Sequence, residues 1–316
     1  MNHHQTEKIC VILNPKAGNQ KAEEAIPLIE KSLQSYFSEW SIEITKGSKH
    51  ATYLAKQAAD ANIDIIAVMG GDGSCHEVVQ GIMKSKNSPI LALIPFGTGG
   101  DLRKSTKTPK NISKAIQIAA QGEDKSVDVG LIKKTHTDGS IQEEYFINVA
   151  GFGANGKVVE RSNRWSKRFG GRITFLNATV YTSFTYQAPL IKLEWTNTDD
   201  SVETWTGNML SCFVANAQYC GGGMKITPDN SITDGFLHLR ILPEMSVPEQ
   251  LFHMPKLYSN EIEKVPNAVC RTIKHLKAFA PKSQDVSIDL DGELSGILPA
   301  QFSILPKSLT IRAPWG

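Results

Sequence analysis

Residues 65–74 have the sequence IIAVMGGDGS, in which a short apolar run leads directly into a glycine-rich turn. The run is β-branched and uncharged, so it predicts a buried strand of a parallel sheet. After the turn, Val78, Val79, Ile82 and Met83 recur with the period of an amphipathic helix. The glycines therefore lie between a strand and a helix, at the carboxyl end of the strand, where open α/β sheets bind ligands.

This turn has the chemistry of an anion site. Glycines let backbone N–H groups approach an anion, and the helix N-terminus adds unpaired donors. Asp72 is a poor partner for a bare phosphate, but it suits a cation such as Mg²⁺ or a reacting hydroxyl. Two more glycine-bearing turns, NPKAG at 14–18 and PFGTGGD at 95–101, also follow predicted strands. Three such turns on one rim indicate a nucleotide phosphate site.

Other nucleotide motifs are missing from the sequence. None of the three turns is a Walker loop, and no G-x-G-x-x-G follows the first predicted strand. Rossmann-type NAD binding is therefore disfavoured.

The periodicity changes near residue 125. Before it, strands alternate with helices, which predicts βαβ units and a parallel sheet. After it, short alternating runs predict an antiparallel sandwich. We expect an α/β domain over 1–125 and a β-sandwich domain over 126–316, with the last strand a candidate to return to the first domain. The expected strands are 9–13, 41–45, 65–69, 89–94, 127–132, 145–149, 190–195, 209–217, 236–242, 286–290, 300–305 and 309–311, and the helical segments are 21–36, 51–61, 75–84, 112–120, 155–186 and 247–258.

Charge, cysteine content and apolar runs bear on the partners and the compartment of the protein. A net charge of +2 over 316 residues gives no reason to expect a nucleic-acid partner. Five cysteines without a C-x-x-C spacing favour reduced thiols over a disulfide framework. No apolar run approaches the roughly 18 residues of a membrane span, and the first residues do not make a signal peptide. We expect a cytoplasmic protein that meets a membrane only peripherally.

A last short motif, Asp291-Gly-Glu293, lies between two predicted strands. Asp-Gly is a favoured hairpin-turn pair, so the motif is explained in part by a simple turn. Glu293, just past the turn, is left without a structural explanation.

Together these motifs resemble the diacylglycerol kinase catalytic family, and its soluble bacterial lipid kinase branch in particular. The motifs fall in that family's order over nearly the whole chain: NPKAG at 14–18, GGDGS at 70–74, PFGTGGD at 95–101, NVAGFG at 148–153, NAQYCGGGM at 216–224, PDNSITDG at 228–235 and DGE at 291–293. The resemblance implies a three-layer first domain like that of NAD kinases, with a β-sandwich second domain.

The resemblance also implies cofactors and site residues. Glu293 would be the general base, and Asp72 would act at the metal–phosphate end of the site. A second Mg²⁺ site in the β domain would use Asp234 with backbone carbonyls of Ser231 and Phe236, although 233–235 also reads as a plain turn. ATP would be bound by Asn14, Gly18, Thr45, Gly70, Gly71, Asp72, Gly73, Ser74, Cys75, His76, Thr98 and Asp101. Thr45 reads equally well as a strand-end hydroxyl.

Three positions depart from the family pattern. Ser74 stands where threonine is usual, which keeps the hydroxyl. Gly100 replaces a common asparagine, and Asn155 replaces a common aspartate and so removes a charge. These changes leave Asp72 and Glu293 in place.

Two segments bear on lipid contact. A basic cluster with aromatic residues suits an anionic membrane surface or, equally, a solvated helix. Helix 173–184 either lines an acyl pocket or packs on the β domain. The cluster comprises Arg161, Arg164, Trp165, Lys167, Arg168, Phe169 and Arg172.

We therefore expect an ATP- and Mg²⁺-dependent kinase of a lipid hydroxyl, with diacylglycerol as first candidate and a sphingoid base, ceramide or another lipid alcohol next. A kinase for a soluble acceptor such as NAD and a non-catalytic nucleotide- or lipid-binding regulator are the alternatives. The expected partners are a lipid at a membrane surface and a second copy of the chain in a homodimer.

Overall fold

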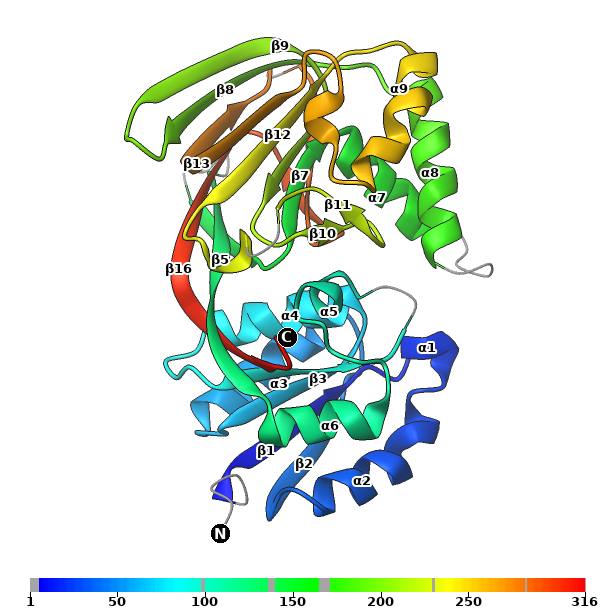
Figure 1. Ribbon diagram of the computed structural model, residues 1–316, viewed down its shortest axis with the longest axis vertical. Coiled ribbons are helices and arrows are strands. Elements are labelled where there is room, and N and C mark those ends of the chain that lie inside the picture. The colour runs from blue at the N-terminus through cyan, green and yellow to red at the C-terminus, as the bar shows by residue number, and fades with distance from the viewer. Residues whose placement is uncertain are drawn as a thin grey trace. The chain divides into compact units, whose positions relative to one another are not determined.

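The computed structural model describes residues 6–97, 100–135, 140–164, 171–228, 231–281 and 283–315 (Figure 1). The chain forms two compact units, one of Met1–Val127 with Lys307–Gly316 and one of Asp128–Pro306. Strands β5 (Glu123–Thr135) and β16 (Ala300–Ala313) each begin in one unit and end in the other.

The N-terminal unit is built on a parallel sheet with the strand order β4-β3-β1-β2. The end of β16 adds a further parallel strand beside β4, with Thr310 opposite Ile90. Its elements are β1 (Lys8–Leu13), α1 (Ala17–Gln20), η2 (Glu23–Ala25), α2 (Ile26–Gln34), β2 (Glu39–Ile44), α3 (His50–Asp60), β3 (Ile65–Gly70), α4 (Asp72–Met83), β4 (Ile90–Pro95), α5 (Asp101–Ser105) and α6 (Ile112–Gln121).

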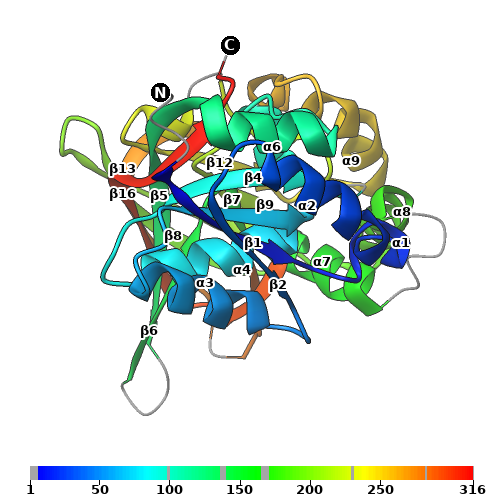
Figure 2. The same cartoon turned by 90° about the horizontal axis from the view of Figure 1, so that it is seen from below.

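Helices cover both faces of this sheet. Ile29 and Leu33 of α2 and Ile116 of α6 pack with Val11 and Ala67 in one fully buried cluster. Helices α3 and α4 contact each other and β3, and Figure 2 shows them across the sheet from α2 and α6. Strands β1, β3 and β4 are apolar on both sides because both sides are covered.

The C-terminal unit is mainly antiparallel, with β7, β9, β12, β13 and the first half of β16 in succession and the β14–β15 hairpin beside β7. Strand β8 pairs with β9 and β13. Its other elements are β6 (Ile141–Phe146), β7 (Val149–Gly153), α7 (Ala154–Arg164), α8 (Gly171–Thr185), β8 (Leu190–Asn197), β9 (Val202–Ala215), β10 (Tyr219–Cys220), β11 (Met224–Lys225), η4 (Ser231–Thr233), β12 (Leu237–Pro243), α9 (Val247–His253), η5 (Met254–Leu257), η6 (Ile262–Lys264), β13 (Val269–Phe279), β14 (Ser287–Leu290) and β15 (Glu293–Ile297).

Two apolar clusters stabilise this unit. The larger one contains Trp195 and the stacked rings of Phe152 and Phe302, whose centroids are 5.7 Å apart. The second lies on the other face of the strands, where Leu210 and Phe213 of β9 meet apolar residues of the helical segments. The helices therefore cover one face of the sheet and leave the other for the sandwich core.

The predicted α/β and antiparallel β classes are confirmed, but several strands differ from prediction. The predicted strand 145–149 covers only the end of β6 and the start of β7, and β15 was not predicted. Strand β13 was not predicted, because a register shift between Ile273 and His275 breaks its alternation. The runs 300–305 and 309–311 belong to one continuous strand, β16, which contains Pro306. No helix in the described part of the chain is long and apolar enough to cross a membrane.

Candidate functional site

The three glycine-bearing turns of the N-terminal unit share one edge of its sheet. Leu13 is opposite Met69, and Gly70 is opposite Pro95, so β1, β3 and β4 end level with one another. Backbone hydrogen bonds join the turns, because Asn14 N–H donates to Met69 O at 3.0 Å and Phe96 N–H to Gly70 O at 3.2 Å. The predicted convergence of the turns on one rim is present.

Asn14 and Ser74 connect the first turn to the second. The Asn14 side-chain amide donates to the Ser74 hydroxyl at 2.9 Å. A Cβ on Gly70 would lie 2.5 Å from that hydroxyl, so only glycine fits there. A Cβ on Gly71, in contrast, would meet nothing within 4 Å, which leaves open space beside the first turn of α4.

Asp72 connects the second turn to the third. Its two carboxylate oxygens accept hydrogen bonds from the backbone N–H groups of Gly100 (2.8 Å) and Asp101 (2.7 Å). Gly100 has φ of +110°, which favours glycine over the asparagine common in the family. Asp101 is buried and pairs with Lys104 Nζ at 2.8 Å. Asp72 therefore has a structural task in addition to any contact with a cation.

The remaining predicted nucleotide residues of this unit differ in their settings. Thr45 is buried just after β2, and its N–H donates to Leu13 O at 2.9 Å. Cys75 and His76 have buried side chains inside α4. Gly18 has φ of +60° and lies against the ring of Phe96, which leaves no room for a side chain. Thr98 lies outside the described residues.

The Asp291-Gly-Glu293 motif forms a tight hairpin turn between β14 and β15. Asp291 and Gly292 have φ of +53° and +87°, as a two-residue hairpin requires. The Asp291 carboxylate accepts hydrogen bonds from the N–H groups of three successive residues, Ile147 (3.0 Å), Asn148 (2.8 Å) and Val149 (3.2 Å). Glu293 follows at the exposed start of β15, on a turn that these bonds hold in place.

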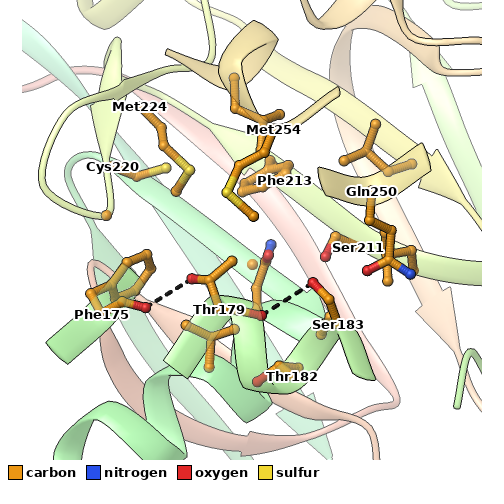
Figure 3. A pocket seen from close by; sticks show the side chains of 18 of the residues that line it. Phe175, Thr179, Thr182, Ser183, Ser211, Phe213, Cys220, Met224, Gln250 and Met254 are labelled. Atoms are coloured by element: carbon orange, nitrogen blue, oxygen red, sulfur yellow. Dashed lines mark hydrogen bonds between the residues drawn. The ribbon is translucent and has the colours of Figure 1, made fainter. Parts of the chain in front are cut away.

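A cavity opens in the C-terminal unit beside this turn. Its outline takes in about 1080 Å³ of space between atoms, with the open solvent at its mouth included. Its walls are mainly apolar, and Phe175 of α8 lies across the cavity from Met224 and Met254, with Phe213 of β9 beside Met254 (Figure 3). Asp289 and Gly292 also line it, so the cavity reaches the residue next to Glu293.

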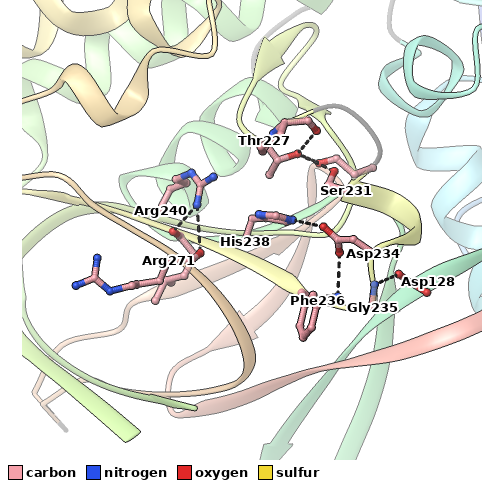
Figure 4. Close-up of polar contacts among 12 residues, drawn as sticks. Asp128, Thr227, Ser231, Asp234, Gly235, Phe236, His238, Arg240 and Arg271 are labelled. Atoms are coloured by element: carbon pink, nitrogen blue, oxygen red, sulfur yellow. Dashed lines mark hydrogen bonds and ion pairs between the residues drawn. The ribbon is translucent and has the colours of Figure 1, made fainter. Parts of the chain in front are cut away.

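The predicted metal residues lie in η4 and in the turn that follows it (Figure 4). Asp234 accepts a 2.9 Å hydrogen bond from Phe236 N–H at Oδ1, and Oδ2 is 2.8 Å from His238 Nε2. The next residue, Gly235, donates its N–H to Asp128 at 2.7 Å. Ser231 hydrogen-bonds through its hydroxyl to Thr227.

This donor set fits Mg²⁺ in kind. One carboxylate with backbone oxygens of a tight turn is the oxygen-rich environment that Mg²⁺ prefers, and the Asp234 side chain is about one-third exposed. Within the described ranges, no three His, Cys, Asp or Glu side chains gather closely enough to hold a metal. A cation here would therefore depend on Asp234 and would compete with His238 for Oδ2.

Comparisons with known proteins match both units. The diacylglycerol kinase catalytic domain model matches residues 8–132, and the YegS C-terminal NAD kinase beta sandwich-like domain model matches residues 148–313. The chain belongs to the family that joins a diacylglycerol kinase catalytic domain to a YegS-type C-terminal domain.

Individual relatives agree with this assignment. A "Diacylglycerol kinase" of Staphylococcus aureus is 27% identical over 96% of this chain and 91% of its own length. A "Probable lipid kinase YegS-like" of Yersinia enterocolitica is 28% identical, with 96% of each chain covered. The prediction of a kinase of this family is confirmed.

Solved structures support the fold of this kinase. A Bacillus anthracis crystal structure superposes with a TM-score of 0.78 at 25% identity and covers 98% of this chain and 96% of that one. Yeast NADH kinase superposes with a TM-score of 0.55 at 9% identity, over 98% of this chain and 83% of that chain. The second likeness shows the fold alone, and it agrees with the predicted NAD-kinase-like architecture.

Sequence analysis of this kinase missed several residues that the structure places in the site. Asp289 was not singled out, although a charged residue between Ile288 and Leu290 of an apolar strand was a visible signal. His238, which pairs with Asp234, carried no such signal because its partner is recognisable only in the folded turn. Of the basic cluster, Trp165, Lys167, Arg168, Phe169 and the side chain of Arg172 lie outside the described residues.

Proposed function

We propose that this kinase transfers the γ-phosphate of ATP, in an Mg²⁺-dependent reaction, to the hydroxyl of a membrane lipid, with diacylglycerol as first candidate and phosphatidic acid as product. The observation that carries the proposal is the mainly apolar cavity whose wall reaches Gly292, one residue before Glu293. A lipid whose chains occupy this cavity would bring its headgroup to the turn that carries the carboxylate.

The N-terminal unit would bind the nucleotide. ATP supplies the phosphoryl group when it is bound, and Mg²⁺ neutralises the developing charge. The joined turns offer backbone N–H groups at the start of α4, beside the open space at Gly71. Asp72 would keep the second and third turns at a fixed separation and would lie at the cation end of the site.

Glu293 would act as the general base. Phosphoryl transfer needs alignment and charge neutralisation, together with a carboxylate that accepts the proton of the attacking hydroxyl. The three hydrogen bonds to Asp291 fix the turn, so Glu293 would be presented on a rigid support.

Peripheral contact with a bilayer would be made by the helices around the cavity. In α8, Phe175 and Thr179 line the cavity, while Leu176 and Phe184 on another face are exposed. In α9, His253 lines the cavity and Phe252 is 74% exposed. Large apolar side chains in water beside a mainly apolar cavity favour insertion into a membrane surface.

The basic cluster gives less support to membrane contact than the exposed apolar residues do. Arg161 donates to the Thr182 hydroxyl at 2.7 Å and lies over the ring of Tyr181. Arg164 is exposed but pairs with Glu160 at 2.8 Å. Arg161 therefore joins α7 to α8, a structural role that the solvated-helix interpretation did not include.

Transfer of labelled γ-phosphate tests the proposal. Mg-ATP is supplied with diacylglycerol, sphingosine, ceramide and NAD in mixed micelles, for wild type, Glu293→Gln and the exposed control Glu263→Gln. We expect a labelled lipid from wild type and the control, and a loss of at least about a hundredfold in Glu293→Gln, because general bases contribute about 10²–10⁴.

Other outcomes are informative. Labelled NAD without labelled lipid would move the assignment to a soluble acceptor. ATP binding without any product would indicate a regulator. Homodimerisation, the expected protein–protein contact, is measured on the same samples by sedimentation equilibrium, and a monomer would contradict it.

A further inference from the structure

Asp289 points into the cavity because of its position in β14. Ile288 and Leu290, on either side of it, belong to the fully buried sandwich core. Since successive side chains of a strand face opposite sides, Asp289 faces the side that the helices cover, and it lines the cavity there. Its cross-strand neighbours are Gly151 and Leu294.

The Asp289 carboxyl is buried and incompletely hydrogen-bonded. The residue is 8% exposed, and Oδ2 has no hydrogen-bond partner among the residues that the structure describes. The adjacent Asn155 amide donates elsewhere, to Cys212 O at 3.0 Å. A buried polar atom without a partner is costly, so its presence in a cavity wall suggests that a ligand completes it.

The surroundings of Asp289 favour its neutral form. Burial, and then the charge of Asp291 two residues on, raise the pKa of Asp289 to about 7. The other titratable side chains of the cavity wall are Cys220 of β10, His253 of α9 and Tyr258 after η5, and no lysine or arginine of the described chain lines it. Asp291 differs from Asp289 in that three backbone N–H groups surround its carboxylate.

We propose that Asp289, in its protonated form, donates a hydrogen bond to an ester carbonyl of an acylglycerol bound in this cavity, and so selects neutral ester-linked lipids. The proposal rests on the proposed lipid kinase function. A neutral carboxyl in an apolar site is a hydrogen-bond donor, and it requires an acceptor rather than a cation. The glycerol esters of diacylglycerol are such acceptors, whereas the ammonium group of a sphingoid base is a donor.

A matched pair of lipids isolates this hydrogen bond. A diacylglycerol is compared with the dialkylglycerol of equal chain length, which lacks only the two ester carbonyls. Wild type should have a KM for the diacyl lipid that is lower by about twofold to tenfold, which is the range of one uncharged hydrogen bond. Asp289→Leu should abolish this preference, so that the diacyl and dialkyl lipids have equal KM values. Asp289→Asn, whose amide N–H donates, should keep part of it.

The pH dependence separates a proton donor from a residue that only fills space. The wild-type preference for the diacyl lipid should fall as pH rises from about 6 to about 8, because Asp289 loses its proton there. Asp289→Asn should show the same preference at every pH. Cys220, His253 and Tyr258 remain in the variant, so a preference that still changes with pH would assign the effect to one of them and overturn the proposal.

A binding measurement keeps the inference distinct from the proposed function. Fluorescent NBD-labelled diacyl and dialkyl lipids are titrated against each protein without ATP. Preferential binding of the diacyl lipid that Asp289→Leu abolishes, with no turnover, would overturn the kinase function alone. Equal binding of the two lipids to wild type, an equal loss for both in Asp289→Leu, or tighter binding of sphingosine that increases with pH would overturn the inference.

Discussion

The backbone N–H of Asp101 donates a 2.7 Å hydrogen bond to the carboxylate of Asp72, so the start of α5 is held by the first residue of α4. The second carboxylate oxygen holds Gly100 in the same way. One side chain thereby fixes the separation of two glycine-rich turns. Its role in stability and its predicted role at the nucleotide can be separated by experiment.

Asp72→Asn should weaken both stability and ATP binding. One acceptor oxygen becomes an NH₂ group that faces an N–H donor, which costs about 1–3 kcal/mol of unfolding free energy. Urea unfolding and calorimetric ATP titration measure the two effects, with Glu24→Gln as an exposed control in the same unit. Unchanged unfolding free energy would contradict the structural role of Asp72.

Gly70→Ala and Gly71→Ala form a matched pair. The new methyl group at residue 70 would lie 2.5 Å from the Ser74 hydroxyl, whereas at residue 71 it would meet nothing within 4 Å. We expect Gly70→Ala to lower the unfolding free energy by about 1–3 kcal/mol, as overpacking does. Gly71→Ala should change it by less than about 1 kcal/mol. Equal losses would show that the Asn14–Ser74 contact does not require Gly70.

Asp291→Gly should impair activity through the turn rather than through the base. Glycine tolerates the positive φ of residue 291 but leaves Ile147, Asn148 and Val149 without their acceptor. We expect a loss of about 2–4 kcal/mol in unfolding free energy and a reduced kcat. Asp291→Asn retains an acceptor oxygen, so its loss should be smaller. If Asp291→Gly is destabilised but keeps the full kcat of wild type, the hydrogen bonds of Asp291 are not needed to position Glu293.

Stability should depend on pH through Asp289. Its pKa is raised to about 7 in the folded protein, so between about pH 4 and pH 7 the folded state binds more protons than the unfolded state. Stability from this group therefore falls as pH rises through that window and is constant above it. Asp289→Asn should remove this fall, and its advantage over wild type should grow to roughly 2–4 kcal/mol by pH 8. Urea unfolding of both proteins from pH 4 to pH 8 measures this difference in unfolding free energy. If the difference does not change with pH, burial of Asp289 does not raise its pKa.

Mg²⁺ should stabilise the turn at Asp234. Millimolar Mg²⁺ is expected to raise the Tm of wild type without ATP, since a ligand that binds only the folded state stabilises it. Asp234→Asn should lose this increase, because the amide cannot supply a charged oxygen. Asp60→Asn is the control, an exposed carboxylate paired with Lys56 outside the turn. An equal Tm increase in Asp234→Asn would place the cation elsewhere.

The sequence allowed the fold to be predicted where one physical signal dominated. Apolar runs between glycine turns located β1, β3 and β4, and their parallel order followed from the alternation with helices. The local pattern did not reveal β13, whose alternation a register shift interrupts, or the continuity of β16, in which a proline lies between the two predicted strands. These strands are stabilised by pairing with distant segments, and that pairing leaves no local period.

The candidate site also has residues that local sequence reveals and residues that only tertiary contacts reveal. Residues within motifs, such as Asn14, Asp72 and Glu293, could be named from sequence. The partner of Asp72 in the third turn, the partner of Asp234 at His238 and the cavity face of Asp289 all depend on tertiary contacts. The pattern of a single sequence does not show which distant residues come into contact.

The passage of β16 into the N-terminal unit has a consequence for biosynthesis. Residues 310–312 supply the strand beside β4, and Arg312 is buried against Glu7 at 2.7 Å and Asp124 at 2.6 Å. When residues 1–127 have left the ribosome, residues 310–312, which form the strand beside β4, have not yet been synthesised. The edge of β4 therefore lacks its β16 partner until the whole second unit has been translated, and an unpaired strand edge is open to pairing with other chains.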